Sequence, residues 1–175
     1  ISSTAHLKVV PELLGWGDPG VSVTAAIQLG SIVAVIAYFR ADLSQVLRGI
    51  SRAFRNGQWR EPEARLGFAM VVGTLPILLI GLGIKFAWAQ GYEQSPLRSV
   101  PSIAIVSIVM ALLLALAERV GARRKQLSEV SGRDGLLVGL AQALALIPGV
   151  SRSGSTLTAA LFDGWQRADA ARFSF

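Results

Sequence analysis

Long uncharged stretches dominate the hydrophobic pattern of the chain. Three windows, 21–39, 66–84 and 99–117, contain no charged residue. Each approaches the ~20 residues that an α-helix needs to cross a hydrocarbon layer of ~30 Å. The pattern therefore predicts three transmembrane helices in an all-α, polytopic membrane protein, organised as one transmembrane domain over 1–175.

The apolar stretch that follows is broken. Residues 135–151 are interrupted by Pro148-Gly149, and the next apolar run, 153–162, is too short to cross a membrane. As a helix, residues 135–147 would rise roughly 20 Å, which falls short of the far surface. These lengths predict a re-entrant segment over about 135–162, with a helix into the membrane, a broken turn at depth and a short helix back.

The placement of the positive charges predicts the orientation. The chain has 17 lysines and arginines against 11 acidic residues and a pI of about 10.8, which could also suit a nucleic-acid-binding protein. However, the arginines gather in the connections 40–65 and 118–134, whereas 85–98 between them has few. This alternation follows the positive-inside rule, so we place 40–65 and 118–134 in the cytoplasm and 85–98 outside. We expect no nucleic-acid partner.

The first cytoplasmic connection has a helical pattern of its own. Apolar residues recur on one face from Leu43 to Phe54, and Arg48, Arg52 and Arg55 occupy other positions. We interpret this as an interfacial helix that lies on anionic lipid and ends at Gly57. A solvated linker is the alternative. The apolar positions are Leu43, Val46, Leu47, Ile50 and Phe54.

The strongest candidate for a chemical site is the run from Pro148 to Thr156. Proline and glycine break the helix, and the small residues after them let backbone N–H groups at the start of the next helix face a ligand. The helix dipole favours an anion there. Arg152 adds a fork of donors that suits phosphate oxygens. The alternative is an arginine that reaches the membrane interface beside serines that cap a helix.

A second polar cluster contains His6, the only histidine of the chain. With Ser2, Ser3 and Thr4 beside it, His6 could activate a hydroxyl, take a proton from water or act as a nucleophile. A histidine at the membrane interface is the alternative. By the charge rule this cluster enters from outside, opposite the run around Arg152. Two broken elements from opposite faces are typical of an inverted repeat with a polar site between them.

Taken together, these motifs resemble the undecaprenyl-diphosphate phosphatase family, also called the bacitracin-resistance protein family. The similarity covers essentially the whole chain in the expected order. It is carried by Ser2-Ser3-Thr4-Ala5-His6, Gln28-Leu29-Gly30 leading to Tyr38-Phe39-Arg40, the run from Pro148 to Thr156, and Ala171-Arg172-Phe173-Ser174-Phe175.

The resemblance implies a multi-pass enzyme of the bacterial plasma (inner) membrane. It would hydrolyse undecaprenyl diphosphate to undecaprenyl phosphate and inorganic phosphate, recycling the lipid carrier for peptidoglycan synthesis and giving bacitracin resistance. Family members have two re-entrant hairpins in inverted repeats. The expected partners are the polyprenyl diphosphate lipid and membrane lipids, with a homodimer as the candidate assembly.

The resemblance also implies roles for individual residues. Arg152 would clamp the diphosphate, and Ser3 and His6 would supply the nucleophile or the acid/base pair, with the choice of attacking group open. The residues expected to bind the diphosphate are Ser2, Thr4, Gly149, Ser151, Arg152, Ser153 and Thr156.

The chain departs from the family pattern at its beginning. The family has a glutamate-rich motif just before the Ser-Ser-Thr cluster, which serves a divalent metal ion (Mg or Ca), and Glu12 and Asp18 do not match that spacing. We therefore expect an internal fragment that lacks its N- and C-terminal parts, with the metal-binding glutamates upstream of Ile1. The full-length protein should depend on the metal, and the fragment should be inactive.

Three other functions compete with this interpretation. A membrane phosphatase of the acid-phosphatase type needs a second histidine after the Ser-Arg pair, and the chain has only His6. A transporter or flippase of a polyprenyl phosphate lipid would share the inverted repeats and broken helices. A structural membrane subunit predicts that neutral substitutions of Arg152 or His6 leave function intact.

Overall fold

The computed structural model describes residues 3–17, 20–93 and 95–175, and this part of the chain is helical without strands. Three short 3₁₀ turns and one isolated bridge between Lys125 and Trp165 complete it. The all-α prediction is confirmed. The helices are α1 (Ser3–Leu13), α2 (Gly20–Tyr38), α3 (Arg40–Asn56), α4 (Pro62–Glu93), α5 (Val100–Val120), α6 (Gly132–Ala143), α7 (Arg152–Phe162) and α8 (Arg167–Ser174).

Two of these helices are long and apolar enough to cross a membrane. They are residues Pro62–Ala87 of α4 and all of α5, Val100–Val120, and they contain most of the predicted windows 66–84 and 99–117. Their outer faces are apolar: Leu79 on α4 and Leu112 on α5 are both 66% exposed. Such faces suit contact with lipid, and the chain is a multi-pass membrane protein. Where each window lies relative to the bilayer stays a prediction.

The first predicted span corresponds to α2, which ends where the chain bends. Residues Ala26–Tyr38 and the helix α3 meet at 69°, with the break at Phe39. The predicted helix in the first connection is confirmed as α3. Gly57 ends it as predicted, with the left-handed φ of 70° that a glycine adopts without strain.

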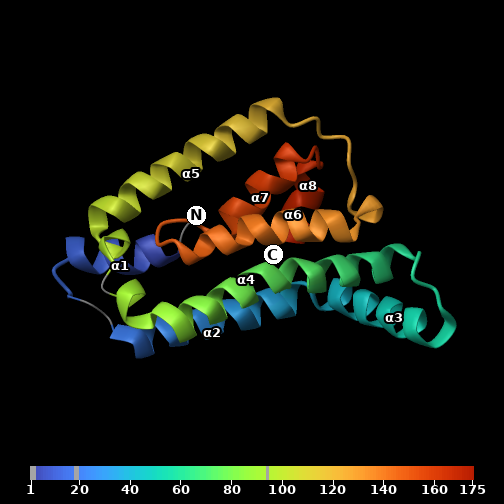
Figure 1. The fold of residues 1–175 in the computed structure, drawn as a ribbon, viewed down its shortest axis with the longest axis horizontal. Coiled ribbons are helices and arrows are strands. Elements are labelled where there is room, and N and C mark those ends of the chain that lie inside the picture. Colours follow the sequence, from blue (N-terminus) through green and yellow to red (C-terminus); the bar gives the residue numbers. More distant parts are fainter. Residues whose placement is uncertain (1–2, 18–19, 94) are drawn as a thin grey trace.

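Close packing between α4 and α6 rests on glycines. A Cβ atom added to Gly139 would lie 2.2 Å from the carbonyl oxygen of Gly73, and one added to Gly135 would lie 2.2 Å from that of Ala69. The backbones therefore touch, and the two helices run side by side (Figure 1). Helix α4 continues through Pro76 as one element.

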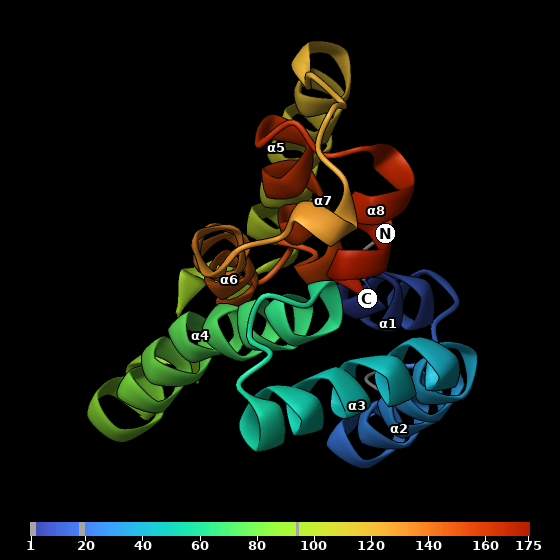
Figure 2. The ribbon, with the colours of Figure 1, turned by 90° about the vertical axis from the view of Figure 1, so that its right-hand side faces the viewer.

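The helices α6 and α7 form a hairpin that packs between α4 and α5 (Figures 1 and 2). The main hydrophobic core lies at the open end of this hairpin, where α6 begins and α7 ends. There, Leu161 and Trp165 are almost completely buried, and Trp165 stacks on Phe173 of α8 with 5.2 Å between ring centroids. The remaining buried members of this core are Ala69, Ala117, Val130, Val138, Ala160 and Ala170.

Candidate active site at the turn between α6 and α7

The turn at the tip of the hairpin is fixed against α5. Gly149 has a φ of 97°, and a Cβ atom there would lie 2.7 Å from the carbonyl oxygen of Ile103. Ser107 donates a hydrogen bond of 3.1 Å to the Gly149 carbonyl. Only glycine meets both the conformation and the close approach without strain. These contacts fix the tip about 5 to 10 Å along α5 from the first residue of that helix.

Helix α7 begins directly after this turn. Ser151 is its N-cap, with its Oγ atom accepting a hydrogen bond of 3.2 Å from the backbone N–H of Gly154. The Oγ atoms of Ser151 and Ser153 lie 3.4 Å apart. The first N–H groups of a helix lack intrahelical acceptors and carry the positive end of its dipole. The sequence motif therefore forms a helix start that suits an anion.

Arg152 occupies the first position of α7, and its side chain is exposed. Among the described residues, no carboxylate pairs with its guanidinium, so the donors of this side chain are available for an anionic ligand. The main-chain carbonyl of Arg152 instead stabilises the first turn of α7. Its oxygen accepts hydrogen bonds from the hydroxyls of Ser155 and Thr156, at 2.9 and 3.0 Å.

The hydroxyl groups of this region point in two directions. Ser151 and Ser153 are half-buried at the helix start. Thr156 lies on the inner side of α7 and is 2% exposed, with its hydroxyl donating to the carbonyls of Arg152 and Ser153. Ser155 is equally buried. The Thr156 hydroxyl is therefore engaged within its own helix. A role for Thr156 in lining a diphosphate stays a prediction.

The second predicted cluster begins at α1. His6 is exposed on this helix, whereas Ser2 lies outside the described residues, as do the side chains of Ser3 and Thr4. Helix α1 contacts α5, the helix that holds the turn at Gly149. Figure 1 shows α1 at the same end of the molecule as the α6–α7 turn. Both clusters are therefore supported by α5, while a direct approach of His6 to Arg152 stays a prediction.

A partly buried ionic cluster connects the start of α6 to the end of α7. Lys125, from the α5–α6 connection, pairs with Asp134 at the start of α6 and, at 2.8 Å, with Asp163 at the end of α7. Asp163 also accepts a hydrogen bond of 2.9 Å from the indole N–H of Trp165. Ser131 donates two hydrogen bonds of 2.7 Å to Asp134. One lysine thus holds both ends of the hairpin, an arrangement that the sequence analysis missed.

The charged forms of Lys125 and Asp134 stabilise each other. Burial lowers the pKa of Lys125, but hydrogen bonds and attraction to Asp134 and Asp163 outweigh it, so this pKa lies above its ordinary value. Burial raises the pKa of Asp134, but the hydrogen bonds from Lys125 and Ser131 outweigh it, so this pKa lies below its ordinary value. Both charged forms are therefore favoured, and the pair persists across the physiological range.

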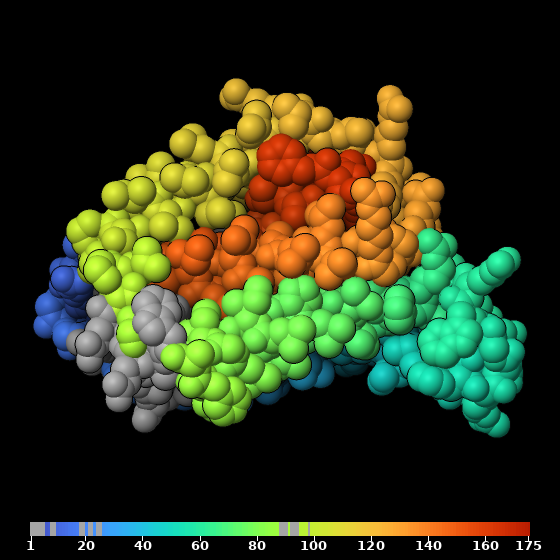
Figure 3. Space-filling view, in the orientation of Figure 1, coloured from blue at the N-terminus to red at the C-terminus, as the bar shows by residue number. Residues whose placement is uncertain are grey.

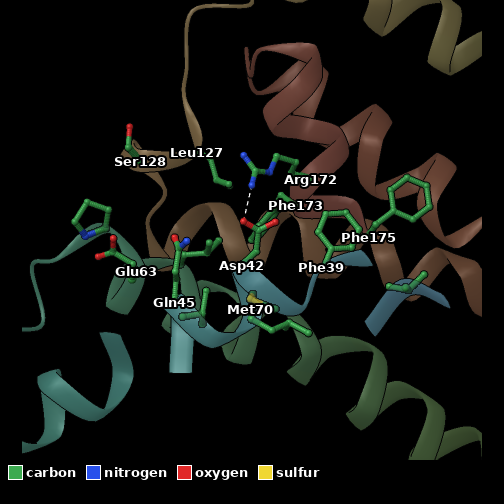
Figure 4. A pocket seen from close by; sticks show the side chains of 15 residues that line it. Phe39, Asp42, Gln45, Glu63, Met70, Leu127, Ser128, Arg172, Phe173 and Phe175 are labelled. Atoms are coloured by element: carbon green, nitrogen blue, oxygen red, sulfur yellow. Dashed lines mark hydrogen bonds and ion pairs between the residues drawn. The ribbon is translucent and has the colours of Figure 1, made fainter. Parts of the chain in front are cut away.

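A second feature is a cavity of about 260 Å³ between the α2–α3 bend, the start of α4 and α8. Arg172 of α8 forms an ion pair of 2.5 Å with Asp42 of α3. Figure 4 shows this pair among the lining side chains, with Phe39 and Phe173 nearby. The walls are mainly apolar, and the ion pair is half-exposed. This cavity contains neither of the predicted site clusters.

A metal ion has no evident ligand set in the described part of the chain. No group of three or more histidine, cysteine, aspartate or glutamate side chains comes together there. The two carboxylates at the open end of the hairpin, Asp134 and Asp163, both pair with Lys125. These residues do not fit a divalent metal site.

Comparison with known proteins identifies the family. The model of the family described as bacitracin resistance protein BacA matches residues 1–175. The chain belongs to this family. Among similar curated proteins, the undecaprenyl-diphosphatase of Synechococcus sp. (strain CC9605) is 93% identical over all 175 residues. That of Parasynechococcus marenigrum (strain WH8102) is 85% identical, and that of Prochlorococcus marinus (strain MIT 9303) is 75% identical.

The chain covers 61%, 61% and 59% of these three relatives, respectively, so it spans about three fifths of their length. The resemblance stated from the motifs is therefore confirmed at the level of the BacA family. The roles assigned to individual residues stay predictions.

Proposed function

We propose that the protein hydrolyses undecaprenyl diphosphate to undecaprenyl phosphate and inorganic phosphate in the bacterial plasma membrane. Membership of the BacA family supports this, as do relatives named undecaprenyl-diphosphatase at up to 93% identity. Such an activity recycles a lipid carrier for peptidoglycan synthesis and gives bacitracin resistance. The observation that carries the proposal is the α7 start, where an exposed Arg152 follows an N-capping serine and forms no ion pair with a carboxylate in the described ranges 3–17, 20–93 and 95–175.

This geometry suits a diphosphate group. The guanidinium of Arg152 can bind two phosphate oxygens at once, and the N–H groups at the start of α7 add dipoles directed at the same charge. Ser151 and Ser153 lie beside them and can donate hydroxyl hydrogen bonds. Because α4 and α5 present apolar outer faces, the long polyprenyl tail can remain in lipid while the head group enters the hairpin tip.

The reaction itself transfers a phosphoryl group to water. The bond between the bridging oxygen and the terminal phosphorus breaks, undecaprenyl phosphate leaves, and the oxygen of water ends in inorganic phosphate. In one route His6 or Ser3 attacks phosphorus, and water then hydrolyses the phosphorylated residue. In the other route His6 takes the proton from the attacking water. Positive charge from Arg152 stabilises the transition state in both.

Two further parts of the proposal concern the whole protein. A divalent metal, Mg or Ca, would add positive charge at the diphosphate, with ligands outside the part of the chain described here. A homodimer is the proposed assembly. Chelation of divalent ions should abolish phosphate release reversibly, and the mass of the detergent-purified protein tests the assembly.

The deciding experiment measures phosphate release from undecaprenyl diphosphate by the purified full-length protein. Arg152→Gln should lower kcat by about 10²–10³-fold, the range found when a group that stabilises transition-state charge is removed. Arg119→Gln, an exposed arginine on α5, is the matched control and should keep full activity. Absence of phosphate release from the unaltered protein would reject the enzyme. Movement of the lipid across vesicles without hydrolysis would favour a transporter instead.

A further inference from the structure

Helix α3 has one face that packs against the protein. Val46, Gly49 and Ala53 are buried on it, and Gly49 lies directly against Glu63 and Ala64 of α4. This spacing repeats every three to four residues, so the three positions form a single stripe along the helix. The stripe leaves most of the circumference of α3 outside the protein core.

A second stripe of α3 is apolar but exposed. Leu47 and Phe54 are 66% and 74% exposed, and their spacing of seven residues places them on the same face. The left-handed turn at Gly57 reverses the chain, and Trp59 packs edge-on against Phe54 with 4.9 Å between ring centroids. Trp59 remains 46% exposed. We name these three residues, Leu47, Phe54 and Trp59, the α3 apolar stripe.

Arginines flank this stripe. Arg48 and Arg55 each follow a stripe residue, which places them about 100° around the helix from it. Arg52 is paired with Glu61 at 3.1 Å, and Arg48 is hydrogen-bonded to Ser44 of its own helix. Arg55 and Arg60 are exposed. Residues 40–60 contain five arginines and one aspartate, so the surface is strongly positive.

The direction of α3 agrees with a position at the membrane surface. Its axis is inclined by 69° to that of α2. If α2 crosses the membrane along its normal, α3 runs within about 20° of the membrane plane. Figure 1 shows α3 beyond the end of α2 and beside the start of α4, and in Figure 3 the blue-green residues of this region project at one end of the molecule. The α3 apolar stripe is therefore not enclosed by the described chain.

We propose that α3 is a binding surface for anionic lipids of the cytoplasmic leaflet. The α3 apolar stripe inserts among the acyl chains, and Arg48, Arg55 and Arg60 bind the lipid phosphates. Exposed aromatic side chains beside arginines are the composition of helices that lie in the membrane interface. The excess of positive charge selects an anionic lipid surface over a zwitterionic one.

The 175-residue chain contains no cysteine, which permits a direct test. A nitroxide spin label is attached to Phe54→Cys, or to Asn56→Cys on the opposite, exposed side of the same helix. Each protein is reconstituted into vesicles of phosphatidylcholine alone or with phosphatidylglycerol. Relaxation by oxygen, which concentrates in lipid, is compared with relaxation by a water-soluble nickel complex. The comparison reports whether each label lies in lipid, in water or within protein.

We expect the label at position 54 to be relaxed by oxygen and shielded from nickel, and the label at 56 to show the reverse. Shielding at 54 should increase with phosphatidylglycerol. Replacing Arg48, Arg55 and Arg60 together by glutamine should remove this increase, since each arginine near an anionic surface favours the bound state about fivefold. The matched control, with Arg119, Arg124 and Arg133 replaced by glutamine, should retain it.

Three results would overturn the proposal. Equal access of nickel to labels 54 and 56 in phosphatidylglycerol vesicles would show that the stripe faces water. Shielding at 54 that ignores lipid charge and the three arginine substitutions would show that anionic lipid is not recognised. An immobile label at 54, inaccessible to oxygen and nickel alike, would show that protein covers the stripe.

Discussion

Replacing Lys125 by methionine should loosen both ends of the α6–α7 hairpin. The substitution keeps most of the volume of the side chain but leaves Asp134, whose side chain is 5% exposed, as a buried charge without a cation. Loss of one partner of a buried pair costs about 3–5 kcal/mol. Asp134 keeps its two hydrogen bonds from Ser131, so we expect the lower part of that range. The pair with Asp163 is more exposed and adds about 0–1 kcal/mol.

The assay is a double-mutant cycle on the free energy of unfolding, measured by titration with sodium dodecyl sulfate in mixed micelles. Lys125→Met, Asp134→Asn and the double variant are compared with Lys85→Met. Lys85 is exposed in the second half of α4 and serves as the control position. Because the double variant no longer contains the unpaired carboxylate, it should recover about 2 kcal/mol relative to the sum of the single changes.

Additive costs in this cycle would refute the reasoning, since they would mean that Lys125 and Asp134 do not stabilise each other. A loss below about 0.5 kcal/mol for Lys125→Met, equal to that for Lys85→Met, would also refute it, because changes of that size are typical of surface positions.

Three other predictions concern the same elements. Gly139→Ala should reduce stability by about 1–3 kcal/mol through the clash with α4, whereas Gly83→Ala, with open space around it, should be neutral or stabilising in the same titration. Gly57→Ala should cost about 1–2 kcal/mol because of its left-handed φ, and faster amide exchange in the last turn of α3 would reveal this. The stabilisation from Asp134 should be present above the pKa of an unfolded aspartate, about 4, and be lost as pH falls through the lower folded value. That from Lys125 should be present at neutral pH and be lost as pH rises through its raised pKa, and unchanged stability at either extreme would contradict these signs.

The helices whose formation depends on the local pattern of apolar residues were predictable from the sequence. Uninterrupted apolar windows identified α4 and α5, and helical spacing with a terminal glycine identified α3 and its end at Gly57. The break before α7 was predictable from the adjacent Pro148-Gly149 pair, because proline removes one N–H donor from the helix and glycine readily adopts non-helical backbone angles. Ser151 was recognisable as a helix-start residue because a serine hydroxyl can accept a hydrogen bond from an N–H group in the first turn of a helix.

What the sequence did not reveal depends on contacts between distant segments. Lys125 and Asp163 are separated by 38 positions and meet only after the hairpin has formed. The inward direction of Thr156 depends on which side of α7 faces the core, and the small polar residues of that helix show no clear apolar stripe. In α3, the periodicity predicted the helix itself. It did not distinguish the apolar residues that contact α4, such as Val46, from those that remain exposed, such as Phe54.

A short broken hairpin needs external supports to place a charged group within a membrane protein. Helices of 12 and 11 residues are marginal by themselves, so α6 and α7 depend on tertiary contacts. Lys125 fixes their open end, the contact of Gly139 with Gly73 fixes α6 along α4, and the contact of Gly149 with Ile103 fixes the tip along α5. A shift of about 1 Å at a phosphate site is enough to reduce catalysis about a hundredfold. Substitutions at Lys125, at the opposite end of the hairpin from Arg152, should therefore lower the proposed phosphate release together with stability, whereas Arg152→Gln should lower phosphate release alone.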